Sequence, residues 1–398
     1  MEQAKYVPKN RYDNTAIRQF SGPNRSNSVP QNDYKGEWKA AVGREVNRFS
    51  AVAYHFAEHL QSELDTPVGI LELAWGGRPI QSFVRREALE ELPEGEIYLK
   101  RQLKHLPAYE RSLKPEWQQG FQSRLDHYKK SLAEWKLNGK EGKRPVEPVR
   151  PVNPMSDASY ASSIYNGMIH PMTRYGIRGA IWYQGESNVG GAEAAIYGEL
   201  LDTMVKDWRS QWGRQFSFYW AQLTSNRTQS DNPNKGGGWP RLQDEQRRAL
   251  NTIPHSGMAV ITDIGDAHNI HPYNKKDVGY RLALWALYHD YGQENIHYTG
   301  PLYKSARFDG ENVIVSFDYS EGLTSMDGQP LRHFALAGDD GVWYWADAVI
   351  DGKSVVVKCA EVKNPSKVRF AWLRNAEGVN LTNHSGLPAS CFSSEFDE

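Results

Sequence analysis

Polar residues able to support acyl-transfer chemistry follow two apolar runs of the sequence. Residues 181–188 read Ile-Trp-Tyr-Gln-Gly-Glu-Ser-Asn, so the first apolar run stops at Gln184. The second polar stretch, residues 263–272, also follows an apolar run and contains His271. An amide side chain can donate a hydrogen bond to an oxyanion, and a histidine can act as a general base near neutral pH. Together they indicate an α/β hydrolase-type site.

A third apolar run ends in glycines instead of polar side chains. Residues 68–73 lead into Ala-Trp-Gly-Gly at 74–77. Gly76 and Gly77 would let a backbone N–H approach a substrate oxygen, although a tight turn alone also accounts for them. Ligands of open α/β sheets bind beyond the carboxyl ends of the strands. We therefore expect the three segments to converge on one site.

Ser187 is a weak candidate for the nucleophile. A nucleophile elbow carries a second glycine two residues after its serine, but Val189 occupies that position here. No other well-placed serine lies ahead of these segments in the chain.

A metal-dependent hydrolase is the first alternative. Asp263, Asp266, His268 and His271 are dense in ligand-type side chains. The chain has no His-Glu-x-x-His pattern to support this reading, and a solvated polar loop is simpler. We predict neither a metal nor a cofactor.

Strand and helix patterns alternate through the first three quarters of the chain, which predicts a doubly wound, mainly parallel sheet covered on both faces. The predicted strands are 68–73, 179–183, 216–223 and 258–264, and the predicted helices are 46–60, 196–208 and 278–288. Residues 87–139 predict a charged helical insertion that ends at Asn138-Gly139. Prolines at every third position from Pro145 to Pro154 predict a stiff, extended spacer.

From about residue 296 the pattern changes to short strands. Residues 313–317, 342–346, 354–358 and 367–372 read as strands, and Asp-Gly pairs at 309–310 and 351–352 predict hairpin turns. We therefore predict two domains, an α/β esterase domain over 1–295 and a small all-β region over 296–398.

Composition excludes several classes of function. A net charge of −1 over 398 residues gives no basic field for nucleic acid. No run of 18 apolar residues could span a membrane. Two distant cysteines, Cys359 and Cys391, cannot form a zinc or disulfide framework.

Four sequence blocks, in order, resemble the sialate O-acetylesterase family of SGNH hydrolases. They are residues 71–80, 165–169, 181–188 and 263–272, and the likeness continues at 300–303 and 386–390. The resemblance implies hydrolysis of acetyl esters on sugars by a serine and a histidine. It leaves the acetylated sugar open, since similar chains act on acetylated xylan, and it suggests a secreted or periplasmic protein.

The resemblance also implies roles for particular residues. His271 resembles the base, Gln184 the side-chain oxyanion donor, and Gly77 or Gly76 the backbone donor. The residues expected to shape the substrate site are Trp75, Asn166, Glu186 and Asn188. His268 and Asn269 stand where relatives often carry an acid, so Asp266, Asp263 or a backbone carbonyl remain candidates to orient His271.

The family's nucleophile motif, Gly-Gln-Ser-Asn-Met, does not occur in the chain. Met1 would fit the methionine that closes this motif, so we expect the serine two residues before Met1, on a first sheet strand that precedes it. The chain as given would then be close to inactive. The second alternative is a carbohydrate-binding protein that has lost its nucleophile.

Overall fold

The computed structural model describes residues 12–227 and 230–397, which form two compact units. The first unit comprises the chain up to residue 24 together with residues 34–80 and 172–398. The second comprises residues 25–33 and 81–171. The expectation about Met1 lies outside the described residues. The predicted domain boundary near residue 295 stays a prediction.

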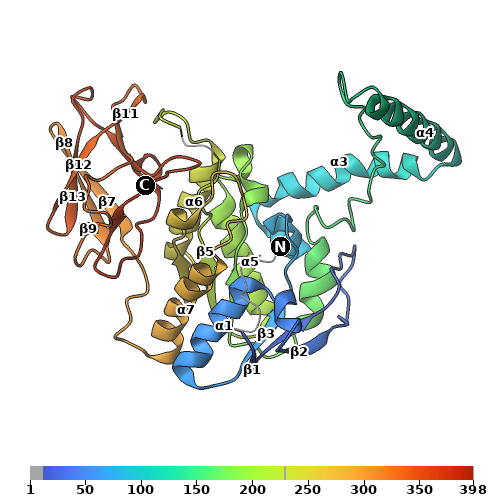
Figure 1. Ribbon diagram of the computed structural model, residues 1–398, viewed down its shortest axis with the longest axis horizontal. Helices are drawn as coiled ribbons and strands as arrows, with labels where there is room; N and C mark the ends of the chain where they lie inside the picture. Colours follow the sequence, from blue (N-terminus) through green and yellow to red (C-terminus); the bar gives the residue numbers. More distant parts are fainter. Residues whose placement is uncertain (1–11, 228–229, 398) are drawn as a thin grey trace. The chain divides into compact units, whose positions relative to one another are not determined.

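Six strands of the first unit form two separate three-stranded sheets, in the orders β2-β1-β3 and β4-β5-β6 (Figure 1). The strands are β1 (Asn14–Ser21), β2 (Glu37–Ala41), β3 (Val68–Glu72), β4 (Gly179–Trp182), β5 (Ser217–Ala221) and β6 (Ser256–Ala259). β1 runs parallel to β3 and antiparallel to β2, whereas β4, β5 and β6 are all parallel. The structure confirms an α/β class with parallel strands, whereas the single doubly wound sheet stays a prediction. The sequence pattern gave no sign of β1 and β2.

Four helices of the first unit cover these strands. They are α1 (Ala51–Leu64), α5 (Tyr197–Trp212), α6 (Gly238–Arg248) and α7 (Lys275–Tyr291). α1 and α7 lie side by side (Figure 1) and share a buried cluster with Tyr219 and Ala221 of β5. α6 was not predicted, because much of its buried face is polar and includes Gln243, Asp244 and Gln246.

Two predicted elements of the first unit have different bounds in the structure. The single helix expected over 46–60 is wrong, because a short 3-10 turn (Glu45–Arg48) is separated from α1 by Ser50. The Ser50 side chain accepts a hydrogen bond from the Ala53 N–H at 3.5 Å and caps α1. The strand expected over 258–264 is shorter, since the ladder of β6 with β5 ends at Ala259.

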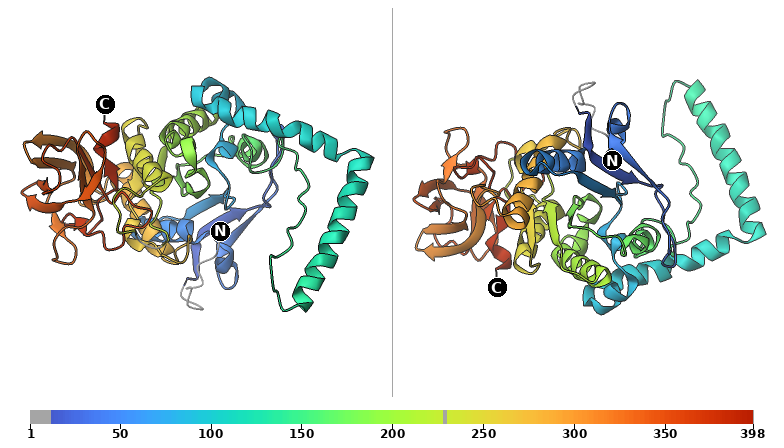
Figure 2. Two further views of the ribbon diagram at one scale, coloured as in Figure 1. Left: turned by 90° about the horizontal axis from the view of Figure 1, so that it is seen from above. Right: turned by 90° about the horizontal axis from the view of Figure 1, so that it is seen from below.

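The second unit is largely helical, as predicted for residues 87–139. Its helices are α2 (Arg86–Glu91), α3 (Glu96–Ser112) and α4 (Pro115–Leu137). Figure 2 shows α3 and α4 as two long rods that meet at an angle. α4 ends directly before Asn138, as expected, but none of its residues is fully buried. Residues 145–153 have no helix or strand, which agrees with an extended spacer.

The C-terminal part of the first unit is an antiparallel β region, as predicted (Figure 1). Its strands are β7 (Leu302–Asp309), β8 (Asn312–Asp318), β9 (Thr324–Ser325), β10 (Phe334–Ala337), β11 (Trp343–Trp345), β12 (Asp347–Asp351), β13 (Ser354–Lys358), β14 (Lys367–Phe370), β15 (Leu381–Thr382) and β16 (Phe392–Ser393). Both predicted hairpins form, with left-handed Gly310 and Gly352 in their turns.

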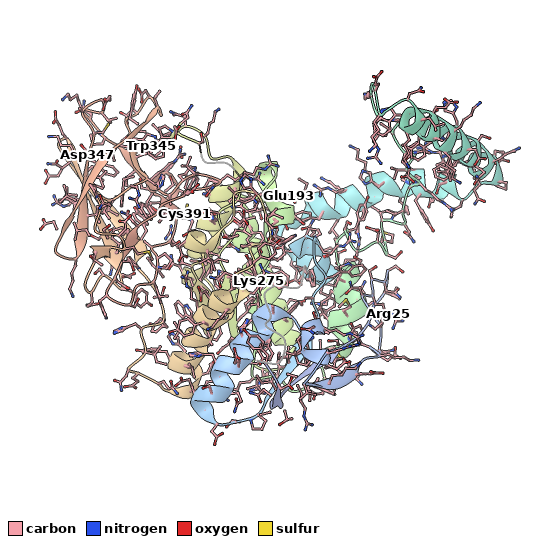
Figure 3. All side chains as sticks on the ribbon, in the orientation of Figure 1. Arg25, Glu193, Lys275, Trp345, Asp347 and Cys391 are labelled. Atoms are coloured by element: carbon pink, nitrogen blue, oxygen red, sulfur yellow. The ribbon has the colours of Figure 1, made fainter. Side chains whose placement is uncertain are left out.

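The two cysteines are free and buried in this β region. The Cys391 sulfur lies 3.9 Å from the Pro240 carbonyl oxygen of α6, so the β region contacts the α/β part here (Figure 3). In the part of the chain that the structure describes, no helix combines the length and apolar character needed to cross a bilayer.

Candidate active site

Gln184 follows β4, and its side-chain amide is held in one orientation. The Tyr197 hydroxyl lies 2.8 Å from the amide oxygen, and the amide nitrogen donates to the Asn188 side-chain oxygen at 3.0 Å. The Trp182 indole N–H donates to the same tyrosine hydroxyl at 3.2 Å, which directs the hydroxyl proton toward Gln184. One of the two amide hydrogens is thus used for positioning. Among the residues that the structure describes, the second amide hydrogen has no hydrogen-bond partner.

Asn188 joins the segments that follow β3 and β4. Its side-chain oxygen accepts hydrogen bonds from the Gln184 amide and from the Ile80 backbone N–H, at 3.0 and 3.1 Å. Its side-chain nitrogen donates to Glu193 at 3.2 Å. Asn188 is fully buried, so a lost partner would leave a polar atom without water to replace it. The predicted convergence of these two segments is present.

The glycine turn that follows β3 is exposed at its tip. Gly77 has a φ of +71°, a left-handed conformation that favours glycine over every other residue. The Trp75 ring lies under the Arg78 guanidinium, whose carbon is 5.0 Å from the ring centroid. The turn therefore places exposed backbone beside an aromatic face that is only partly covered.

The loop that carries His271 is fixed from both sides. The His271 backbone N–H donates to the Asn269 side chain at 2.9 Å. On the other side, the Lys275 ammonium donates to the Pro272 carbonyl and lies 5.7 Å from the centroid of the Tyr183 ring, at the end of β4. Lys275 is the first residue of α7 (Figure 3). It connects the histidine loop to the segment that contains Gln184.

Glu186, two residues after Gln184, interacts electrostatically with His271. Burial raises the pKa of its carboxyl, and the nearby His271 and Lys275 act in the opposite direction. Its carboxylate also accepts the Gly185 N–H at 3.1 Å. The charge of His271 therefore acts on the Glu186 carboxyl, which lies two positions after Gln184 in the chain. Sequence reasoning placed Glu186 at the substrate and missed its closeness to His271.

The two aspartates considered as partners of His271 are engaged elsewhere. Asp263 forms a two-point ion pair with Arg281, at 2.6 and 2.7 Å. Asp266 accepts the His268 backbone N–H at 2.8 Å. Within residues 12–227 and 230–397, neither carboxylate forms a hydrogen bond with the His271 ring. The described residues also contain no group of three or more side chains that could hold a metal ion.

Ser187, the weak candidate for the nucleophile, and Asn166, an expected substrate-site residue, belong to different units. Ser187 is exposed on the short turn that follows Gln184, and among the described residues it forms no hydrogen bond with the His271 ring. Asn166 belongs to the second unit, where it is buried in a turn (Tyr165–Ile169) and donates to the Asn27 carbonyl at 3.2 Å.

A cavity of about 200 Å³ lies at the carboxyl ends of β1 and β3. Gly76, Glu72 and Lys275 are among the residues that line it. The Glu72 carboxylate accepts hydrogen bonds from Gln19 and Ser21, at 2.8 and 2.9 Å, and burial raises its pKa. These groups were missed, because β1 has no distinct apolar alternation in the sequence.

Known proteins similar to this chain identify its family. No family model matches the chain. A crystal structure of a carbohydrate acetylesterase from Xanthomonas citri superposes with a TM-score of 0.75 and 30% identity, over 96% of this chain and 73% of that one. The chain belongs to the carbohydrate acetylesterase family.

Sialate O-acetylesterases are also similar to this chain, at a lower sequence identity. The rat and human proteins are each 27% identical to it over 69% of the chain. The chain spans about half the length of these curated relatives, 49% and 45% respectively. The resemblance derived from the sequence motifs is confirmed.

Proposed function

We propose that the protein is a carbohydrate O-acetylesterase that removes acetyl groups from acetylated sugars by a serine acyl-enzyme mechanism, on an SGNH-type fold. The observation that carries this proposal is the junction at Asn188. It holds the Gln184 amide and the glycine turn together, while the neighbouring Glu186 lies within the electrostatic reach of His271. An oxyanion donor, a backbone donor and a general base are the parts that ester hydrolysis by a serine nucleophile needs besides the serine itself.

In the proposed reaction a serine hydroxyl attacks the acetyl carbonyl while His271 takes its proton. The free Nε2 hydrogen of Gln184 and the backbone N–H groups of Gly76 or Gly77 stabilise the oxyanion. The sugar hydroxyl then leaves with the proton from His271. A water molecule, deprotonated by His271, attacks the acyl-serine and releases acetate.

Glu186 is the acid that we propose to stabilise the charged imidazole. Burial raises the pKa of the Glu186 carboxyl and the nearby His271 lowers it, whereas the Asp263 carboxylate is paired with Arg281. Asp266, three residues after Asp263, is the second candidate, because only one of its carboxylate oxygens accepts the His268 N–H.

The serine is proposed to come from residues that precede Met1 in a longer polypeptide. Ser187 is the alternative inside the chain. A binding protein without catalysis is the second candidate function, and it is favoured by the absence, among the described residues, of a serine hydrogen-bonded to the His271 ring.

The test measures p-nitrophenyl acetate hydrolysis by the chain and by a version extended in frame at its amino end. We expect turnover in the extended version alone, and loss of at least a hundredfold in kcat for its His271→Ala variant. Ser187→Ala is the matched control and should leave the extended enzyme's rate within twofold.

If the chain and its extended version hydrolyse p-nitrophenyl acetate at equal rates, and Ser187→Ala abolishes this activity, the nucleophile is Ser187. If neither chain turns over, the binding protein is favoured. The substrate class is then decided by measuring the acetate released from acetylated sialic acid and from acetylated xylan in parallel assays.

A further inference from the structure

Two histidine rings from distant parts of the sequence meet on the surface of the first unit. His297 lies in the segment that joins α7 to β7, and His384 lies in the loop between β15 and β16 (Figure 1). Their Nε2 atoms are 2.8 Å apart, although the residues are 87 positions apart in the sequence. Both residues are exposed, so an ion from solution can reach the two nitrogens.

One hydrogen bond sets the tautomer of the His384 ring. Its Nδ1 lies 2.6 Å from the Glu321 carbonyl oxygen, which can only accept, so Nδ1 carries the ring proton. In the neutral ring Nε2 is then an acceptor or a metal ligand. A backbone carbonyl that accepts the other ring N–H is a common partner of a metal-bound histidine.

The separation of the two nitrogens matches that of neighbouring ligands of one metal ion. Imidazole nitrogens lie about 2.0–2.1 Å from a bound metal, so two of them at a right angle are about 2.8–3.0 Å apart. At the tetrahedral angle that zinc prefers, the separation would be about 3.3 Å. The observed 2.8 Å therefore fits two adjacent positions of a square-planar or tetragonal ion, the geometry typical of Cu(II) and Ni(II).

The mutual orientation of the rings differs from that of a straight hydrogen bond. The ring planes are 89° apart, and the ring centroids are 4.1 Å apart. A straight N–H···N bond would place the centroids about 5 Å apart, because each centroid lies behind its own nitrogen. The two ring axes are therefore bent relative to each other, as they are when both nitrogens bind a third atom.

The segments that carry the two histidines are held together by Asn383. Its side-chain amide donates to the carbonyls of Thr299 and Tyr319, both at 3.0 Å. Asn383 is buried, so water does not compete for these bonds. Gly322 leaves room for the histidine loop, since a Cβ atom at this position would lie 2.8 Å from the Cβ of His384.

We propose that His297 and His384 form a binding site for a divalent transition metal, with Cu(II) bound most tightly, and that the ion ties the segment after α7 to the β region. Water molecules complete the coordination of this two-histidine site. Imidazole is a suitable ligand for copper and nickel, and the affinity of such sites among first-row divalent metals is greatest for Cu(II). Neither histidine belongs to the candidate active site, so the inference does not depend on the proposed function.

The test titrates the full chain with Cu(II) and follows the electron paramagnetic resonance of the bound ion. We expect the tightest site to hold one ion per chain and to show the hyperfine pattern of two imidazoles. His297→Ala and His384→Ala should each weaken this site by more than about a hundredfold, since losing even an outer-shell partner costs about 10–100-fold. His127→Ala, which removes an exposed histidine of α4, is the matched control and should leave the Kd within about twofold.

Gly322→Ala keeps both imidazoles and tests their placement. Its methyl group displaces His384, so the affinity for Cu(II) should fall about tenfold, with circular dichroism showing that the variant is folded. In the parent chain, Cu(II) should also slow backbone hydrogen exchange in residues 383–386.

Three results would overturn the site. The first is the absence of a saturable Cu(II) site, which would leave the two rings as a hydrogen-bonded pair only. The second is an unchanged Kd in His297→Ala or His384→Ala, or the spectrum of a single imidazole. The third is Zn(II) bound as tightly as Cu(II), because the right-angle placement of the nitrogens favours copper.

Discussion

The contact between Asn188 and Glu193 allows a sharp test of the junction that holds the site. In Asn188→Asp the side-chain oxygen that accepts from Ile80 and Gln184 is kept. The side-chain nitrogen, which donates to the Glu193 carboxylate at 3.2 Å in the parent chain, is replaced by a second carboxylate oxygen. The substitution therefore changes the contact with Glu193 and almost no volume.

The expected cost follows from this geometry. The lost hydrogen bond contributes about 1 kcal/mol. Two like charges about 4 Å apart repel by about 4 kcal/mol near a protein surface, and partial exposure of Glu193 reduces this. We expect Asn188→Asp to lower the free energy of unfolding by about 3 kcal/mol at pH 8, which lowers the Tm by about 6 °C.

The decrease in the free energy of unfolding caused by Asn188→Asp should depend on pH. Burial and Glu193 raise the pKa of the introduced carboxyl above its unfolded value of about 3.9. Its protonated form donates to Glu193, so the stability is present below that unfolded pKa and is lost as the pH rises through the folded pKa. The difference from the parent chain should grow with pH by at most about 1.4 kcal/mol per unit.

Urea unfolding at pH 4.5, 6 and 8 measures this difference. Asn188→Asp combined with Glu193→Gln is the matched control, because an amide then faces the new carboxylate and most of the stability should return. A loss that is independent of pH, or a double variant as unstable as the single one, would refute the assigned contact.

Three further substitutions test the same site. Tyr197→Phe should lower the free energy of unfolding by about 1 kcal/mol and, in an extended active enzyme, lower kcat about tenfold with KM unchanged, because the hydroxyl that orients Gln184 is lost. Glu186→Gln should leave stability unchanged near pH 4 and raise it above pH 6, as followed by Tm, since the raised pKa of the parent carboxyl makes its ionised form costly. Asp263→Ala should lower the free energy of unfolding in urea by about 3 kcal/mol, because it leaves the buried Arg281 guanidinium uncompensated, while the pH profile of kcat in the extended enzyme stays unchanged.

Apolar periodicity was enough to predict most of the α/β elements. β3, β4, β5, α5 and α7 lie close to the predicted ranges, because long helices and buried strands repeat apolar residues at fixed steps. α6 escaped prediction because its buried face is polar. Its Gln246 side chain accepts the Leu223 backbone N–H at 2.8 Å, a contact that no hydrophobic pattern reveals.

The amide, the two glycines and the histidine of the candidate site can be recognised from the residue order alone, because each follows an apolar run that predicts a strand. The polar groups that they contact depend on how distant segments pack. Ile80 and Asn188 are 108 positions apart, and Asp263 finds Arg281 although His271 is nearer in the chain. Hydrogen bonds act over about 3 Å, so their partners are set by how strands and helices pack and leave no trace in local residue order.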